Sequence, residues 1–256
     1  MTDTITFLGT AGARFVVIHQ FLASGGAWLS LGDTQVLFDP GPGSLVQVAR
    51  RKLEPAKLDA IILSHRHLDH SGDINIMIEA MTDGGTKKRG MVFAPADALD
   101  HDPVILSYLR SYPQSIQVLT EGRSYEINDI SFKTPVTHKH QVETYGFIFQ
   151  TPRHTFSWIT DTRYFDDLAS NYEGDLLVIN VVRLKPGAPL DHLSLPEVKS
   201  IIEELRPKTA ILTHFGMTMW RARPWELAAR LTQETGVSVV AARDGLKFDL
   251  AHLQMR

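Results

Sequence analysis

Residues 61–73 read Ile61-Ile62-Leu63-Ser64-His65-Arg66-His67-Leu68-Asp69-His70-Ser71-Gly72-Asp73. The three apolar residues at the start predict a short buried strand, and the polar residues after them predict a turn. That turn carries three histidines and an aspartate within six positions, and these side chains offer imidazole nitrogen and carboxylate oxygen to a metal ion. A low-complexity histidine tract would not follow a buried strand in this way. We therefore expect a metal site, with His65 and His67 pointing the same way because they are two residues apart in an extended segment.

Other histidines and aspartates also come directly after predicted strands. They are His138 and His140, Asp161, and His214. The last of these follows Ile211-Leu212-Thr213, which repeats the order of apolar residues, hydroxyl and histidine found at residues 61–65. This faint internal likeness fits a fold built from two similar αβ halves.

The pattern H-x-H-x-D-H at residues 65–70 resembles the motif of the metallo-β-lactamase superfamily, whose members are mostly dinuclear metal hydrolases. The nearest branch is that of the tRNA 3′-processing endonucleases and the small phosphodiesterases related to them. The resemblance covers nearly the whole chain. It implies one domain over residues 1–256 with a four-layer αβ/βα sandwich and the metals at the edge where the strand ends meet.

The resemblance also implies a ligand set. The first ion would be held by His65, His67 and His140, the second by Asp69, His70 and His214, and Asp161 would bridge them. His140 fits the family spacing ahead of Tyr145-Gly146 better than His138, which we expect as a neighbour in the pocket. Asp39, at the end of a strand, matches an aspartate that hydrogen-bonds the metal loop, although a turn-forming aspartate is an equally good interpretation. We assign catalytic roles to Asp69 and His192.

The expected cofactors are two divalent metal ions. The chain has no cysteine, so the ligands are nitrogen and oxygen only, and zinc is the expected ion with manganese or iron as alternatives. Two ions about 3.5–4 Å apart would share a water and lower its pKa from about 16 toward about 7. The bridging hydroxide would then be the nucleophile, and no G-x-S-x-G motif or catalytic cysteine competes for that role.

Phosphodiesters are the substrates that the sequence favours. His192 stands two residues ahead of Ser194, a helix N-cap, and resembles an extra histidine of the tRNA-processing branch, which could stabilise charge or protonate a leaving oxygen. The tRNA-processing enzymes are expected to carry a basic loop after the first strand, an acidic residue upstream of this histidine and a long basic arm. This sequence lacks all three features. Transfer RNA is therefore disfavoured against a small-molecule or nucleotide-derived substrate. Two alternatives remain: hydrolysis of esters, thioesters or lactones on the same centre, and an iron-bearing oxidoreductase of the same fold.

Composition and charge limit which kinds of binding partner we expect. Hydrophobic residues make up 43% and charged residues 21%, which is typical of a soluble globular protein, and the formal charge of −3 argues against a strongly basic nucleic-acid surface. The N-terminal residues lack a basic segment followed by a long apolar one, so we expect no signal peptide, no membrane span and a cytoplasmic location. Trp220 and Trp225 could serve a homodimer contact, with core packing as the alternative.

Three stretches carry further structural expectations. Residues 10–26 read as a mixed loop, and residues 96–112 read as mainly helical around Pro103. Residues 237–241 and 246–250 read as closing strands joined by an Asp244-Gly245 turn.

Overall fold

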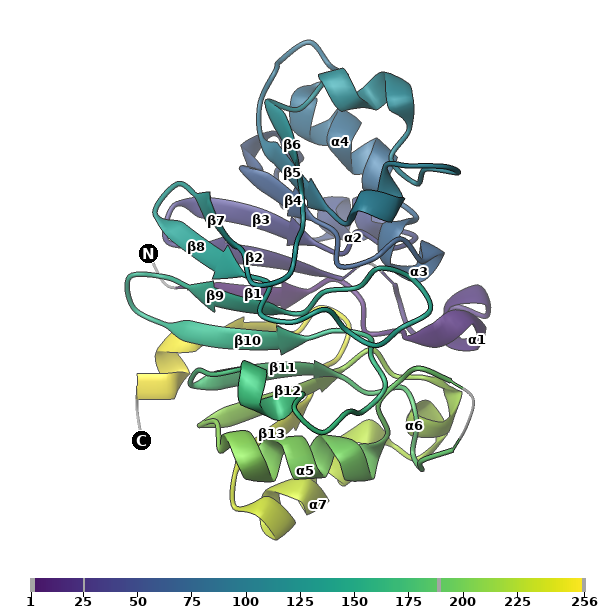
Figure 1. Ribbon diagram of the computed structural model, residues 1–256, viewed down its shortest axis with the longest axis vertical. Helices are drawn as coiled ribbons and strands as arrows, with labels where there is room; N and C mark the ends of the chain where they lie inside the picture. Colours follow the sequence, from purple (N-terminus) through teal and green to yellow (C-terminus); the bar gives the residue numbers. More distant parts are fainter. Residues whose placement is uncertain (1–2, 25, 188–189, 255–256) are drawn as a thin grey trace.

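Two seven-stranded sheets make up the centre of the part of the chain that the computed structural model describes, residues 3–24, 26–187 and 190–254 (Figure 1). The first sheet has the order β14-β1-β2-β3-β4-β5-β6, and the second has the order β13-β12-β11-β10-β9-β8-β7. The strands of the first sheet are β1 (Thr4–Phe7), β2 (Ala27–Leu31), β3 (Thr34–Phe38), β4 (Ala60–Ile62), β5 (Met91–Ala94), β6 (Ser115–Val118) and β14 (Lys247–Asp249). Those of the second are β7 (Ser124–Ile127), β8 (Ile130–Lys133), β9 (Phe147–Gln150), β10 (Thr155–Ile159), β11 (Leu176–Asn180), β12 (Thr209–Thr213) and β13 (Ser238–Ala241).

The strands alternate their side chains between two separate cores. In β3, Val36 and Phe38 enter the core between the sheets, whereas Leu37 enters the core on the outer face of the first sheet. Successive side chains of a strand point to opposite faces, so fully apolar strands must be covered on both sides. Phe38 stacks on Trp158 of the second sheet with ring centroids 4.4 Å apart, which joins the two sheets across the central core.

Helices cover the outer face of each sheet and complete four layers. On the first sheet lie α2 (Ser44–Arg50) and α4 (Ile74–Thr82), and α4 buries Ile74, Met77, Ile78 and Met81 at helical spacing. On the second lie α5 (Leu195–Leu205) and α7 (Pro224–Thr235), with Val198, Ile201 and Leu231 in the outer core. The helix α5 begins with a capping box, in which Ser194 and Glu197 satisfy each other's backbone N–H groups. The expected αβ/βα sandwich is therefore confirmed.

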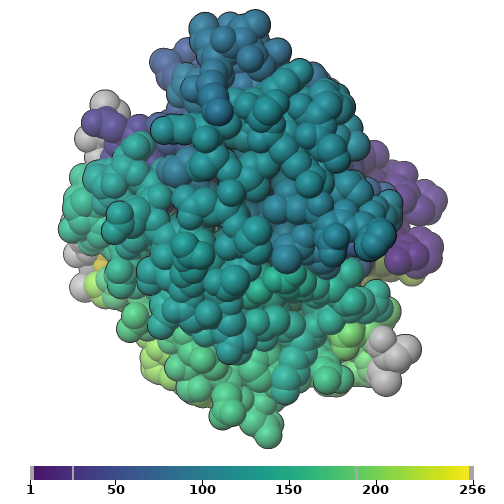
Figure 2. All heavy atoms as spheres, turned by 45° about the horizontal axis from the view of Figure 1, so that its top comes forward, coloured from purple at the N-terminus to yellow at the C-terminus, as the bar shows by residue number. Residues whose placement is uncertain are grey.

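The carboxyl ends of the parallel strands meet at one edge of the sandwich. Strands β3 to β6 run parallel in the first sheet, and β10 to β13 run parallel in the second. The short helices α1 (Ala13–Ile18), α3 (Leu68–Ser71) and α6 (Met217–Arg221) follow the strand ends on this side (Figure 1). Loops at such an edge are where α/β folds place their ligands. In the space-filling view, teal residues from the middle of the sequence lie across the face between the blue first half and the green second half (Figure 2).

Three expectations about local structure were wrong. Residues 10–26 include the helix α1 rather than loop alone. Residues 96–112 form only the short 3₁₀ turns η2 (Ala96–Ala98) and η3 (Ser107–Ser111), because Asp102, just before Pro103, adopts a left-handed φ of 55° that no helix can accommodate. The two closing strands β13 and β14 belong to different sheets, so the Asp244-Gly245 turn is not that of a hairpin.

The remaining short elements are the 3₁₀ turns η1 (Pro55–Lys57), η4 (Ala169–Asn171) and η5 (Leu250–Gln254). None of the helices in the described ranges is long and apolar enough to cross a membrane.

Candidate metal centre

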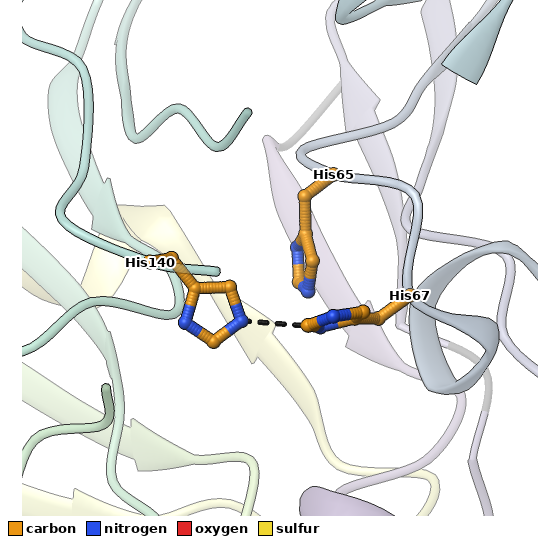
Figure 3. Close-up of side chains that lie close together, drawn as sticks. All are labelled: His65, His67 and His140. Carbon is orange, nitrogen blue, oxygen red and sulfur yellow. Dashed lines mark hydrogen bonds between the residues drawn. The ribbon is translucent and has the colours of Figure 1, made fainter. Parts of the chain in front are cut away.

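Three histidines from two distant loops converge on one point. His65 and His67 follow β4, and His140 comes from the loop between β8 and β9 (Figure 3). The Nε2 atom of His140 lies 3.1 Å from Nδ1 of His67, and the ring of His65 stands with its centroid 4.9 Å from that of His67 and 5.1 Å from that of His140. One ring nitrogen from each of the three falls within 4.8 Å of the other two, a separation that permits all three to bind one ion.

A second group of donors lies beside the first. It consists of Asp69 and His70 from α3 and of His214, which follows β12. The Oδ2 atom of Asp69 is 3.8 Å from Nε2 of His70 and 3.4 Å from Nε2 of His214. The structure thus brings together the two sets of three residues named from the sequence.

Asp161, at the end of β10, lies between the two groups. Its Oδ2 atom is 3.9 Å from Nε2 of His65, 3.4 Å from Nε2 of His70 and 3.4 Å from Nδ1 of His192. Its Oδ1 atom is 3.3 Å from Nδ1 of His214. Asp161 therefore presents a carboxylate oxygen to histidines of both groups, and a carboxylate of this kind could bind a cation held by either group.

Several ring nitrogens of this cluster have no hydrogen-bond partner. Among the residues that the structure describes, seven buried side-chain nitrogen or oxygen atoms lack a partner, and five of them belong to His65, His70, His192 and His214. Leaving a buried polar atom without a partner costs about 1–3 kcal/mol, so such a concentration requires an explanation. Metal ions accept lone pairs from imidazole nitrogen, and the unpartnered atoms therefore fit the divalent ions that the donor set suggests.

Asp39 holds two of the histidines in position. Its Oδ1 accepts the backbone N–H of Ser64 at 2.6 Å, and its Oδ2 accepts the hydroxyl of Ser64 at 2.7 Å and lies 2.9 Å from Nδ1 of His70. The Ser64 oxygen is in turn 3.0 Å from Nδ1 of His65. In their neutral forms both rings therefore carry the proton on Nδ1 and leave Nε2 available, because a hydrogen-bond partner of one ring nitrogen sets the tautomer. The predicted hydrogen bonding of Asp39 to the metal loop is confirmed.

The sequence did not reveal two further supports. Asn180, at the end of β11, donates its side-chain N–H to Oδ1 of Asp161 at 2.8 Å and so fixes the orientation of the carboxylate, with Oδ2 facing His65, His70 and His192. The carbonyl of Asp191 accepts the Nδ1–H of His140 at 2.8 Å, which leaves Nε2 of His140 directed toward His67. Nothing in the local sequence distinguishes these two residues, because their role depends on a neighbour far along the chain.

The backbone around His214 is strained and closely packed. His214 has a left-handed φ of 59°, and so does Asp39 with 48°, at the ends of strands in the two different sheets. Non-glycine residues adopt this conformation at a cost, and such positions cluster at functional sites. Gly12 passes so close that a Cβ atom on it would lie 2.4 Å from Nδ1 of His214. Any larger residue at position 12 would displace this ring.

Three buried or partly buried carboxylates, those of Asp39, Asp69 and Asp161, shift the pKa values at the centre. Burial lowers the pKa of His70, but Asp69 and Asp39 outweigh it and raise that pKa well above its usual value. Burial raises the pKa of Asp161, but His214, His192 and His70 outweigh it and hold that pKa well below its usual value. The cluster therefore favours a cation, either a proton on His70 or a metal ion that displaces it.

His65 and His67 are kept neutral. Burial, and after it the neighbouring ring of His70, lowers the pKa of His65 well below its ordinary value. Burial, followed by the ring of His140, lowers the pKa of His67 to about 4. Neutral imidazole is the form that binds metal, so these two rings need not lose a proton at neutral pH.

His138 does not reach the cluster and lies behind Asp161. Its Nε2 accepts the hydroxyl of Tyr172 at 2.5 Å, and its Nδ1 lies 3.2 Å from the carbonyl of Asp161 and 3.1 Å from the hydroxyl of Thr160. Both ring nitrogens of this buried residue are therefore used within the protein. Of the two histidines in this turn, His140 and not His138 joins the groups of donors.

Acid should destabilise the protein through His138. Burial lowers its pKa to about 4 from an ordinary 6.5, so the unfolded chain binds more protons than the folded one between these values. The contribution of neutral His138 to the free energy of unfolding is complete above pH 6.5. It is lost as the pH falls toward 4, at up to about 1.4 kcal/mol per pH unit. Urea unfolding of chelator-treated protein should show a smaller loss over this range in His138→Gln. The exposed control His101→Ala should lose as much stability as the wild type. If the free energy of unfolding of His138→Gln falls with pH as steeply as that of the wild type, His138 is not the group responsible.

His192 lies within the cluster rather than beside it. Its side chain is 15% exposed, and its ring centroid is 5.1 Å from that of His140. It forms a further possible ligand group with His140 and Asp161. Burial lowers the pKa of His192 although Asp161 opposes this shift. The residue named as catalytic from the sequence is thus close enough to act on anything bound at the centre.

Comparison with known proteins identifies the family. Residues 34–215 match the family model of the β-lactamase superfamily domain. An uncharacterized protein of Methanocaldococcus jannaschii is 31% identical over 98% of this chain and 96% of its own length, and a ribonuclease Z of Methanococcus maripaludis is 23% identical over 81% and 74%. The crystal structure of the metallo-β-lactamase fold protein YhfI of Bacillus subtilis matches 97% of this chain and 100% of its own, with 20% identity and a TM-score of 0.80. The chain therefore belongs to the metallo-β-lactamase superfamily of metal-dependent hydrolases.

Proposed function

We propose that the protein is a dinuclear metal-dependent hydrolase of phosphodiesters. The observation that carries the proposal is the pair of adjacent donor groups, His65/His67/His140 and Asp69/His70/His214, with Asp161 between them. Two sites that share a carboxylate suit two neighbouring cations better than one, because each group alone can supply three donors.

The two donor groups and Asp161 would hold zinc, or alternatively manganese or iron, through nitrogen and oxygen atoms only. When bound, two such ions would lower the pKa of a shared water toward about 7 and provide a hydroxide nucleophile together with Lewis acidity for the phosphoryl oxygens. Asp39 and Ser64 keep the ligand rings of His65 and His70 oriented, and Asn180 keeps the bridging carboxylate oriented. His192 donates a proton or an N–H hydrogen bond to the leaving oxygen.

The choice of phosphodiesters is supported by His192 and by a relative. A histidine next to the metal ligands can assist an alkoxide leaving group, which is the difficult step in phosphodiester cleavage. The matching protein of Methanococcus maripaludis is named ribonuclease Z. Because the chain lacks a strongly basic composition, we favour a small or nucleotide-derived phosphodiester over transfer RNA. A homodimer stays a prediction: Trp225 is 56% exposed and packs against Trp220 at 6.4 Å between ring centroids.

The decisive experiment combines metal analysis with a substrate panel. Protein purified without chelators should contain close to two equivalents of divalent metal by mass spectrometry. It should hydrolyse bis(p-nitrophenyl) phosphate or cyclic nucleotides, and chelation should abolish this activity. Turnover of lactones, thioesters or carboxylic esters with no turnover of phosphodiesters would replace the proposal with the ester hydrolase. Redox-active iron with no hydrolysis would favour the oxidoreductase, and cleavage of a precursor tRNA in preference to small diesters would overturn the substrate class.

A further inference from the structure

The peptide segment Asp191–His192 contacts the metal centre through more than one group. The carbonyl of Asp191 accepts the Nδ1–H of His140, which is a proposed metal ligand. The next residue, His192, places its ring beside Asp161. One short piece of backbone therefore sets the orientation of two functional rings. A side chain that fixes this backbone would therefore help to position the rings of both His140 and His192.

Arg183 is the side chain that holds it. Its guanidinium donates to the carbonyl of His192 from Nε at 3.1 Å and from Nη2 at 2.6 Å, and its Nη1 donates to the carbonyl of Gly187. A planar guanidinium can donate several hydrogen bonds in a fixed geometry, which a lysine ammonium cannot reproduce.

The backbone of Arg183 forms hydrogen bonds with residues that directly follow the Asp191–His192 segment. Its N–H donates to the carbonyl of Leu193 at 3.3 Å, and its carbonyl accepts the N–H of Leu195 at 2.9 Å, at the start of α5. Arg183 also follows β11 by only three residues, so it is tied directly to the second sheet. The guanidinium therefore connects the Asp191–His192 segment to the rigid part of the fold.

We infer that Arg183 is a positioning residue of the metal centre, acting through the Asp191–His192 backbone on both His140 and His192. Its effect on His140 concerns metal binding and does not depend on which reaction the protein catalyses. Its effect on His192 rests on the proposed function. Loss of a group that orients a ligand from behind typically lowers metal affinity by about 10- to 100-fold.

The test compares Arg183→Met with a matched control. Arg110 in η3 holds a different loop in the same manner, since its guanidinium donates to the carbonyls of Leu99 and Ile105, and neither of these residues belongs to the centre. In Arg183→Met, the zinc dissociation constant from chelator competition should rise about 10- to 100-fold. In Arg110→Met it should stay unchanged. Arg183→Lys should fall between wild type and Arg183→Met, which provides a second variant if the methionine protein folds poorly.

A second readout does not depend on hydrolysis. In the metal-free protein, NMR should show a solvent-protected Nδ1–H proton of His140, and this signal should broaden or vanish in Arg183→Met while persisting in Arg110→Met. Retention of both the signal and the zinc affinity in Arg183→Met would overturn the inference. Because both measurements are independent of substrate, they decide it even where the wild type proves inactive on phosphodiesters.

Kinetics then test the connection to His192. If Arg183 acts through His192, adding Arg183→Met to His192→Ala at saturating zinc should lower kcat no further than His192→Ala alone, since the two changes remove one effect. Additive losses in kcat would contradict that half of the inference.

Discussion

A His67→Ala variant should purify with less than its full complement of metal and should lose nearly all activity. His67 contributes one of the three ring nitrogens of the first group, and its Nδ1 lies 3.1 Å from Nε2 of His140. Removing it leaves two histidine nitrogens and the shared carboxylate of Asp161, which should hold the ion far more weakly. Since the metals are expected to contribute several kcal/mol of transition-state stabilisation, hydrolysis should slow by at least about 10³-fold. Metal content by mass spectrometry and initial rates at fixed zinc would measure both effects.

His214→Ala should have an equally large effect through the second group. The ring of His214 is buried, and neither of its nitrogens has a hydrogen-bond partner among the residues that the structure describes. Its truncation should therefore remove a ligand without breaking a hydrogen bond to those residues. We therefore expect metal loss with little loss of fold, visible as an unchanged circular dichroism spectrum. His101→Ala, on an exposed residue outside the cluster, should keep both metal and activity. Full metal content and near-normal rates in His67→Ala or His214→Ala would contradict the proposed centre.

His192→Ala should slow cleavage of diesters with poor leaving groups by about 10²- to 10⁴-fold, the range that general acid catalysis supplies. Diesters of p-nitrophenol should be affected far less, because that leaving group needs little help from a proton. Burial lowers the pKa of His192, so at neutral pH the ring acts mainly through an N–H hydrogen bond or through a small protonated fraction. The measurement is kcat/KM across a series of alkyl and aryl phosphodiesters, compared between wild type and variant.

Metal content separates this role from a structural one. His192 forms a possible ligand group with His140 and Asp161, so it could hold an ion instead of assisting the leaving group. If it acts as the acid, His192→Ala retains two metal equivalents and shows a steeper dependence of rate on leaving-group pKa. Loss of one equivalent, together with an equal slowing of all substrates, would identify His192 as a ligand.

The local pattern at residues 61–73 was sufficient to predict the strand β4 and the donors His65, His67, Asp69 and His70, although the last two lie on the helix α3 and not in the predicted turn. These depend on chain neighbours, and alternation along an extended segment already places two histidines on one side. The distinction between His138 and His140 was less certain from sequence. It became clear only from the hydrogen bonds of His138 to Tyr172 and to the carbonyl of Asp161.

By itself, the sequence determined which segments carry donors, because a strand followed by a histidine or aspartate is a local pattern. The four layers were expected only through the resemblance of the motif at residues 65–70 to the metallo-β-lactamase superfamily. The tertiary structure alone decided which donors meet, that β13 and β14 enter different sheets, and that Asn180, Arg183 and the Asp191 carbonyl support the centre. The physical reason is that these supports are hydrogen bonds between residues brought close only by folding. A backbone carbonyl in particular has the same chemistry in every residue, so no sequence pattern can mark it.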